Sequence, residues 1–126
     1  MSNYTDDQLR QLAERLAVEV CGWRMEIAHD RQYEGHGNFI VLDYVMYVNR
    51  DNTEIYYVED WRPWERLEQA WMVKDALFVP KSMDTFNKRS TFVELFHGIP
   101  LLLLKSEQAA RAIFDAACQA MEYNNE

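Results

Sequence analysis

The residue types that could carry out chemistry are few in this 126-residue chain, and their spacing matches no known catalytic or metal site. The three histidines, His29, His36 and His97, show no HExxH-type arrangement. His29 and His36 would approach each other as metal ligands only if the loop between them folded back. Exposure to water is the simpler interpretation, and His97, next to Gly98, is expected in a turn. We therefore expect no metal and no cofactor.

The nucleophiles give no clearer signal. Cys21 and Cys118 both lie in helical apolar patterns, which favours buried free thiols over the alternative of a disulfide. Adjacent carboxylates such as Glu59 and Asp60 usually point in different directions. An enzyme that uses His36, Glu59 or Asp60 is therefore a minor alternative, and the sequence predicts a protein without catalytic residues.

The charge of the chain is more informative. It has 13 Lys and Arg against 21 Asp and Glu, a net charge of −8, which argues against direct binding of nucleic-acid phosphates. Residues 1–60 alone carry a net charge of −7. An acidic face can steer a basic protein partner, although acidity that serves only solubility is the alternative. The candidate partner-binding residues are Asp6, Asp7, Glu14, Glu26, Asp30, Glu34, Asp51, Glu54, Glu59, Asp60 and the loop tryptophan Trp61.

Asp43 interrupts an otherwise apolar segment, where an unpaired carboxylate would be costly. Pairing with Arg62, Arg66 or Lys74 would satisfy it, so a structural role is favoured. The alternative is a small-ligand site, for example for a nucleotide signal, built from Asp43, Tyr44, Arg62 and Arg66.

The elements that must position these residues follow from apolar periodicity. Thr5 and Gln8 form a capping box, and Gly22 suits a left-handed helix end. The spacing predicts helices at about 6–21, 64–78 and 106–121. Alternating or apolar runs predict strands at 23–27, 39–48, 54–58, 91–96 and 101–104, with loops at 31–38 and 81–89. The strand at 39–48 is apolar on both faces, which is typical of an interior strand.

These expectations combine into one α+β domain over residues 1–126. We expect three helices packed on a four- to five-stranded, mostly antiparallel sheet in helix/sheet/helix layers. The longest apolar run is far shorter than the roughly 20 residues of a membrane span. The polar, acidic first residues lack the pattern of a secretory signal, so we expect a cytoplasmic protein.

Three segments together resemble one protein family. They are LAERLAVEVCGW (12–23), DWRPWERLEQAWMVKDAL (60–77) and SEQAARAIFDAACQAM (106–121). The order of these segments resembles the phage ABA sandwich domain family of small phage and prophage proteins. The matching positions are Gly22, Trp23, Trp61, Pro63, Ala70, Trp71, Val73, Ala109, Ala112 and Ala116. The resemblance implies a layered helix/sheet/helix fold and a phage or prophage origin, and it implies no particular activity.

The sequence thus predicts a small acidic phage or prophage accessory protein that acts by protein binding in a bacterial host cell. Its sharpest form is an inhibitor of a host or defence nucleic-acid-binding machine, similar in effect to an anti-CRISPR protein or a DNA mimic. Small-ligand binding and a purely structural role are the alternatives. The oligomeric state is left open.

Overall fold

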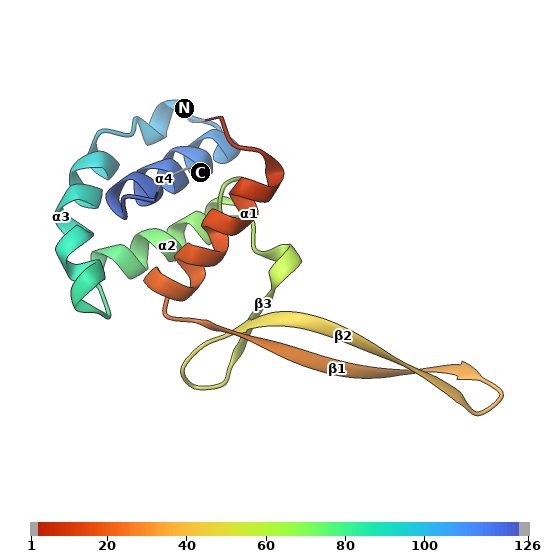
Figure 1. Ribbon diagram of the computed structural model, residues 1–126. Helices are drawn as coiled ribbons and strands as arrows, with labels where there is room; N and C mark the ends of the chain where they lie inside the picture. Colours follow the sequence, from red (N-terminus) through yellow and green to blue (C-terminus); the bar gives the residue numbers. More distant parts are fainter. Residues whose placement is uncertain (1–2, 124–126) are drawn as a thin grey trace.

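The computed structural model describes residues 3–123, except for the side chains of Asp30 and Glu54. Helices gather into one body, and a long two-stranded arm leaves that body (Figure 1). The protein is therefore α+β with an antiparallel sheet, as predicted. The described residues form four α-helices, one more than expected.

The first helix begins and ends where the sequence predicts. In α1 (Asp6–Arg15), the backbone N–H of Gln8 donates to Thr5 Oγ1 at 3.2 Å, and the Thr5 N–H donates to Gln8 Oε1 at 2.8 Å. The helix continues as a wide π-helical turn, η1 (Leu16–Val20). Gly22 then adopts φ +75°, a left-handed conformation that costs glycine little. The change of direction at Gly22 starts the arm.

The arm is an antiparallel hairpin of β1 (Arg24–Gly35) and β2 (Asn38–Val48). The predicted loop at 31–38 is wrong, because the strands pair almost to the tip, where Tyr33 lies opposite Phe39 with ring centroids 5.3 Å apart. Only a tight glycine-rich turn remains, with positive φ at Gly35, His36 and Gly37. Pairing between the strands, which local turn signals do not report, extends the hairpin.

The third strand, β3 (Glu54–Tyr57), pairs only with the inner end of β2, from Met46 to Val48, and the described sheet has the order β1-β2-β3. The expectation that 39–48 is an interior strand is wrong for its outer part. Phe39 is 60 % exposed and Val41 57 %, whereas Met46, Tyr47 and Val48 are buried. No helix covers the outer arm, so the predicted helix/sheet/helix layering does not extend to it (Figure 1).

The other helices form the rest of the body. They are α2 (Leu67–Phe78), α3 (Met83–His97) and α4 (Ser106–Ala120), and α4 contacts both α2 and α3. The strands predicted at 91–96 and 101–104 are wrong: the first lies in α3 and the second holds the short 3-10 helix η3 (Leu101–Leu103). Ser82 caps α3, and Phe92 and Phe96 lie on one face of it, both against Phe78. Helical packing of these aromatic rings overrides their preference for strands.

The body and the arm meet at a cluster of buried aromatic rings. Trp61 is 1 % exposed and its Nε1 donates to the Ala13 carbonyl at 2.8 Å. Trp23, which opens the arm, lies with its ring centroid 4.8 Å from that of Trp61, and Tyr47 of β2 packs against both. This cluster fixes the inner end of the hairpin to α1. Among the described helices, none is long and apolar enough to cross a membrane.

Candidate functional site

Acidic residues from two elements adjoin one buried hydrogen bond at the body–arm junction. Glu14 belongs to α1, whereas Glu59 and Asp60 belong to the 3-10 turn η2 (Val58–Asp60). Ala13 directly precedes Glu14, and Trp61 directly follows Asp60. The hydrogen bond from Trp61 Nε1 to the Ala13 carbonyl therefore joins the two elements beside these carboxylates. Within residues 3–123, no cation forms an ion pair with these three carboxylates. We call Glu14, Glu59 and Asp60 the acidic flank.

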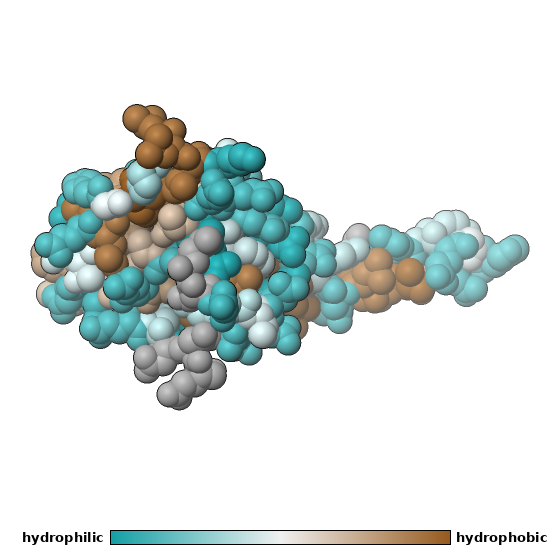
Figure 2. Space-filling model, turned by 90° about the horizontal axis from the view of Figure 1, so that it is seen from above, coloured by the Kyte–Doolittle hydropathy of each residue, from teal (hydrophilic) through white to brown (hydrophobic). Residues whose placement is uncertain are grey.

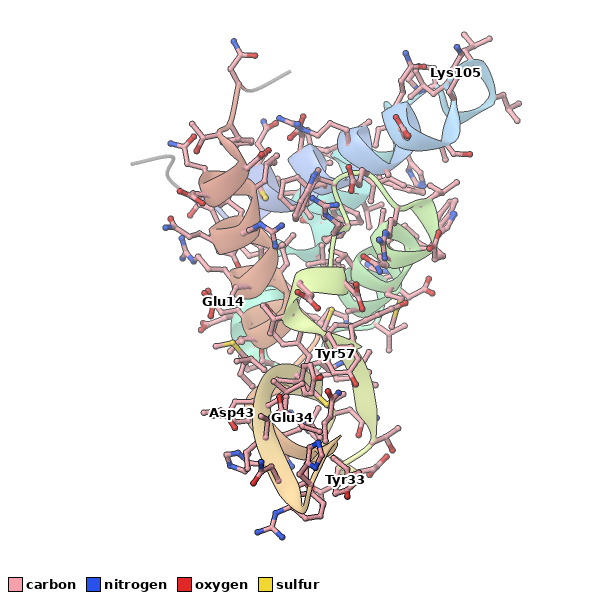
Figure 3. All side chains as sticks on the ribbon, turned by 90° about the vertical axis from the view of Figure 1, so that its right-hand side faces the viewer. Glu14, Tyr33, Glu34, Asp43, Tyr57 and Lys105 are labelled. Atoms are coloured by element: carbon pink, nitrogen blue, oxygen red, sulfur yellow. The ribbon has the colours of Figure 1, made fainter. Side chains whose placement is uncertain are left out.

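A crevice of about 260 Å³ opens beside this flank, between α1 and the hairpin. It is lined by Arg10, Asp43, Tyr44, Val45, Tyr57, Val58 and Glu59. The rings of Tyr44 and Tyr57 lie 5.5 Å apart in its wall. Figure 3 shows Glu14 and Asp43 on the same side of the molecule, one above the other. The crevice therefore combines aromatic walls with two carboxylates and one arginine.

Electrostatics at the junction agree with this placement. Burial, the larger cause, and the nearby negative charge of Glu14 together raise the pKa of Tyr47 to about 12. Glu14 thus lies close enough to the inner hairpin to influence it, although the two are far apart in sequence.

The buried side chain of Gln69 holds the loop that follows η2. Its Nε2 donates to the Asp60 carbonyl at 2.9 Å, and its Oε1 accepts from the Arg62 backbone N–H at 2.6 Å. Arg66 also donates to the Asp60 carbonyl, at 3.1 Å. The sequence interpretation missed Gln69. The available signal was a glutamine one turn before Val73, on the apolar face of the predicted helix.

The remaining predicted partner-binding acids do not join the flank. Glu26 pairs with Arg24 at 2.7 Å, and Glu34 lies beside the arm tip. Asp51 lies in the turn between β2 and β3, at the end of β2 away from the tip. Asp6 and Asp7 are exposed in the first turn of α1, where their negative charges stabilise the positive N-terminal end of the helix dipole. The side chains of Asp30 and Glu54 lie outside the described residues. The acidic residues are therefore spread over several surfaces, and the flank is one of them.

Trp61 is a correction to the prediction. As a loop tryptophan it was a candidate anchor for a partner, but its side chain is buried and hydrogen-bonded to α1. It positions the acidic flank and offers no exposed surface.

The four residues of the predicted small-ligand site are not brought together. Asp43 and Tyr44 line the crevice, but Arg62 pairs with Glu65 at 3.1 Å and Arg66 is bound to the Asp60 carbonyl. None of the cations proposed to pair with Asp43 does so. Its partner is His29, whose Nδ1 lies 2.6 Å from Asp43 Oδ1.

The other reactive groups are also separate. His36 lies at the arm tip, away from Glu59 and Asp60 of η2, and no cluster of three metal-ligating side chains occurs among the described residues. Cys21 and Cys118 are free and buried, as predicted, and burial raises the pKa of both thiols to about 12. They are therefore protonated and shielded at neutral pH.

A larger cavity, of about 600 Å³, lies between α3, α4 and the segments near the two ends of the described chain. It is lined by Tyr4, Leu95, Ile99, Ala112, Asp115, Ala116, Cys118, Gln119 and Tyr123. Asp115 is held by Arg111 at 3.0 Å, and burial raises its pKa above the ordinary value. The lining combines apolar side chains with the polar groups of Tyr4, Asp115, Gln119 and Tyr123, and Asp115 already has a partner in Arg111.

The outer arm exposes apolar side chains, three of which, Phe39, Val41 and Val45, the sequence interpretation placed in an interior strand. Because cross-strand partners share a face, Ile27 and Val45 lie on the same face as Val41, Tyr33 and Phe39. These five side chains are 42–65 % exposed. Figure 2 shows a hydrophobic stretch along the arm and a second hydrophobic protrusion on the helical body. The most exposed leucines of the body are Leu102 and Leu103, in η3.

No protein-family model matches the sequence, and comparison with curated proteins and with solved structures gives no match either. The resemblance to the phage ABA sandwich domain family therefore stays a prediction.

Proposed function

We propose that the protein acts by binding another protein that carries a basic surface, and that the acidic flank makes this contact. The observation that carries the proposal is the gathering of Glu14, Glu59 and Asp60 from two elements without a described cation to neutralise them. Because no described cation forms an ion pair with them, these carboxylates are available to a partner's lysines and arginines. The proposal assigns no catalytic step to the protein.

The crevice beside the flank supports the same function. An arginine or lysine side chain of a partner fits between the Asp43 and Glu59 carboxylates, with the Tyr44 and Tyr57 rings beside it. Cations bind favourably over aromatic faces, by about 0.5–2 kcal/mol. Arg10, on the α1 side of the crevice, disfavours a second cation there and so limits the site to one basic side chain.

Charge also disfavours nucleic acid as the direct partner. A two-stranded ribbon can enter the major groove of DNA. However, residues 24–48 contain two arginines against four acidic residues and two histidines. Binding to a phosphate backbone requires the opposite balance.

The specific form of the proposal is that of a phage or prophage accessory protein. An acidic flank that occupies a basic nucleic-acid groove would inhibit a host or defence machine by competition. We expect a partner that is retained by this protein to bind its nucleic acid more weakly when the protein is added. If the partner's affinity for nucleic acid does not change, the inhibition is contradicted, while the proposal of protein binding still stands.

The test uses immobilised protein, a bacterial lysate and two charge variants. The flank variant carries Glu14→Gln, Glu59→Gln and Asp60→Asn. The control variant removes three exposed carboxylates from α3 and α4, through Asp84→Asn, Glu94→Gln and Glu107→Gln. We expect wild type and control to retain the same protein at low salt and to release it as salt rises, because exposed charges are screened. The flank variant should bind at least about tenfold more weakly, a change of ~1.4 kcal/mol. Equal loss in both variants would mean that net charge alone acts, and it would overturn the proposal.

A further inference from the structure

The outer arm presents a face with exposed apolar side chains at both ends, and beyond Val45 none of the described helices packs on it. We call the face that carries the odd-numbered side chains of both strands the odd face. Beyond the inner pair Met25–Tyr47, its exposed apolar members are Ile27 at 61 %, Tyr33 at 65 %, Phe39 at 60 %, Val41 at 57 % and Val45 at 42 %. On the opposite face, Ile40, Leu42 and Tyr44 are only partly exposed. The odd face is therefore the more water-exposed of two apolar faces.

A hairpin of this kind is not stable by itself. Two-stranded ribbons are marginal in water unless a third strand or a packed surface supports them. In this protein β3 supports only the inner end of β2, as far as Met46, and the helices pack only there. The pairing from Ile27–Val45 to Tyr33–Phe39 lies beyond the support of β3, and a cover on the odd face would stabilise it.

We propose that this cover is the odd face of a second copy of the chain, packed antiparallel about a two-fold axis near the middle of the arm. Along the odd face, the apolar pair Ile27–Val45 is followed by the His29–Asp43 pair, the Arg31–Val41 pair and the Tyr33–Phe39 pair. Both end pairs are apolar, and the two middle pairs carry the charged side chains. Antiparallel packing therefore places the inner apolar group of one arm on the outer group of the other, and this self-complementarity is what a two-fold interface requires.

The size of the face fits a dimer. An aromatic side chain can bury about 150–250 Å², so the exposed fractions leave on the order of 500–600 Å² of apolar surface on each arm. Their polar neighbours, His29, Arg31 and Asp43, lie on the same face. With them the buried area approaches the roughly 800 Å² per partner of a stable interface.

Charge permits the pairing despite the net charge of −8 on each chain. Asp43 is already paired with His29, so it brings no unpaired acid to the centre of the interface. A 12-residue strand such as β1 spans about 40 Å, so antiparallel arms hold the two acidic bodies well apart. This separation exceeds the screening length of about 8 Å at physiological ionic strength. The acidic flank (Glu14, Glu59 and Asp60) contains no residue of the odd face, so flank binding and dimerisation can fail separately, although the odd face shares Asp43 and Val45 with the crevice beside the flank.

The test is the molar mass of the purified protein, measured by light scattering after size exclusion and by sedimentation between about 1 and 200 µM. We expect wild type to reach twice the chain mass of 15.0 kDa. Val41→Lys places an unpaired charge in each half of the interface and should weaken dimerisation about 100-fold, ~2.7 kcal/mol. Gln32→Lys is the matched control, because Gln32 is exposed on the opposite face of the same arm, and it should remain dimeric.

Each outcome decides the proposal. A monomeric wild type at 200 µM overturns it without reference to any variant. If both variants are dimers, the interface lies elsewhere in the molecule. If both variants are monomers, the odd face is not specifically responsible for pairing. Either result overturns the proposed dimer. Hydrogen exchange of the wild-type arm adds an independent readout: residues 27–33 and 39–45 should become more protected as the concentration rises, whereas protection that does not change contradicts the pairing.

Discussion

At the scale of single residues, Gln69 helps to hold the loop after η2, because its side chain satisfies the Asp60 carbonyl and the Arg62 backbone N–H. Gln69→Ala leaves the Asp60 carbonyl and the Arg62 N–H with fewer partners in a buried setting. We expect the free energy of unfolding to fall by about 1–3 kcal/mol. Urea denaturation measures this change. Gln11→Ala, on the exposed side of α1, is the control and should cost nothing measurable; equal effects of the two variants would contradict the role of Gln69.

The two cysteines give a pH-dependent prediction. Burial raises both thiol pKa values from 9.0 to about 12, so the folded protein favours the protonated thiols. That stabilisation is fully present below pH 9, the ordinary thiol value, and is lost as the pH rises from about 9 to 12. A disulfide reagent should therefore modify neither thiol of the native protein at pH 8 and both after unfolding.

A surface thiol provides the comparison for that experiment. Ser90→Cys introduces an exposed cysteine in α3, and we expect one rapid modification in this variant. Rapid modification of Cys21 or Cys118 in the native wild-type protein would show that this thiol is accessible to solvent and would contradict the prediction.

At the scale of elements, the arm should be separable from the helical body. The hydrophobic core includes Tyr47, at the inner end of the hairpin. It includes none of residues 27–45, which form the outer arm. Joining Ala28 to Tyr44 through an Asn-Gly turn preserves a cross-strand pair and removes the outer arm. We expect the helical circular dichroism signal to persist and the melting temperature to change by only a few degrees. Loss of cooperative unfolding would show that the outer arm is part of the core.

Local signals predict some elements of this fold well and others poorly. The capping pair of Thr5 and Gln8 and the left-handed Gly22 are local, and both are present as predicted. The segment from Thr91 to Phe96 combines β-branched and aromatic residues, which favours a strand, but Phe92 and Phe96 are also spaced for one helix face. Contacts with Phe78, a residue of another helix, decide in favour of α3.

The same distinction applies to the candidate site. Composition identifies the excess of carboxylates, but only the buried hydrogen bond from Trp61 to Ala13 brings Glu14 next to η2. An apolar run such as Phe39–Val48 is read as interior because periodicity cannot report whether anything covers it. Its exposed outer part follows from the long pairing with β1, which no local pattern encodes.

At the scale of the whole molecule, the protein has a helical body and an arm that extends away from it and carries a hydrophobic stretch (Figures 1 and 2). The acidic flank belongs to α1 and η2, at the inner end of the arm. If two arms pair, the dimer presents two flanks at opposite ends. A partner with two basic sites at that spacing would gain affinity from simultaneous binding. Val41→Lys should then weaken retention of such a partner although it leaves every flank residue in place, and identical retention would show that one flank is sufficient.

The most direct test of flank binding is hydrogen exchange of the protein with and without the partner retained at low salt. The account predicts that amides of α1 and η2 gain protection in the complex, that those of α3 do not, and that the protection disappears as ionic strength rises. Protection confined to α3 or to the leucines of η3, unaffected by salt, would contradict it.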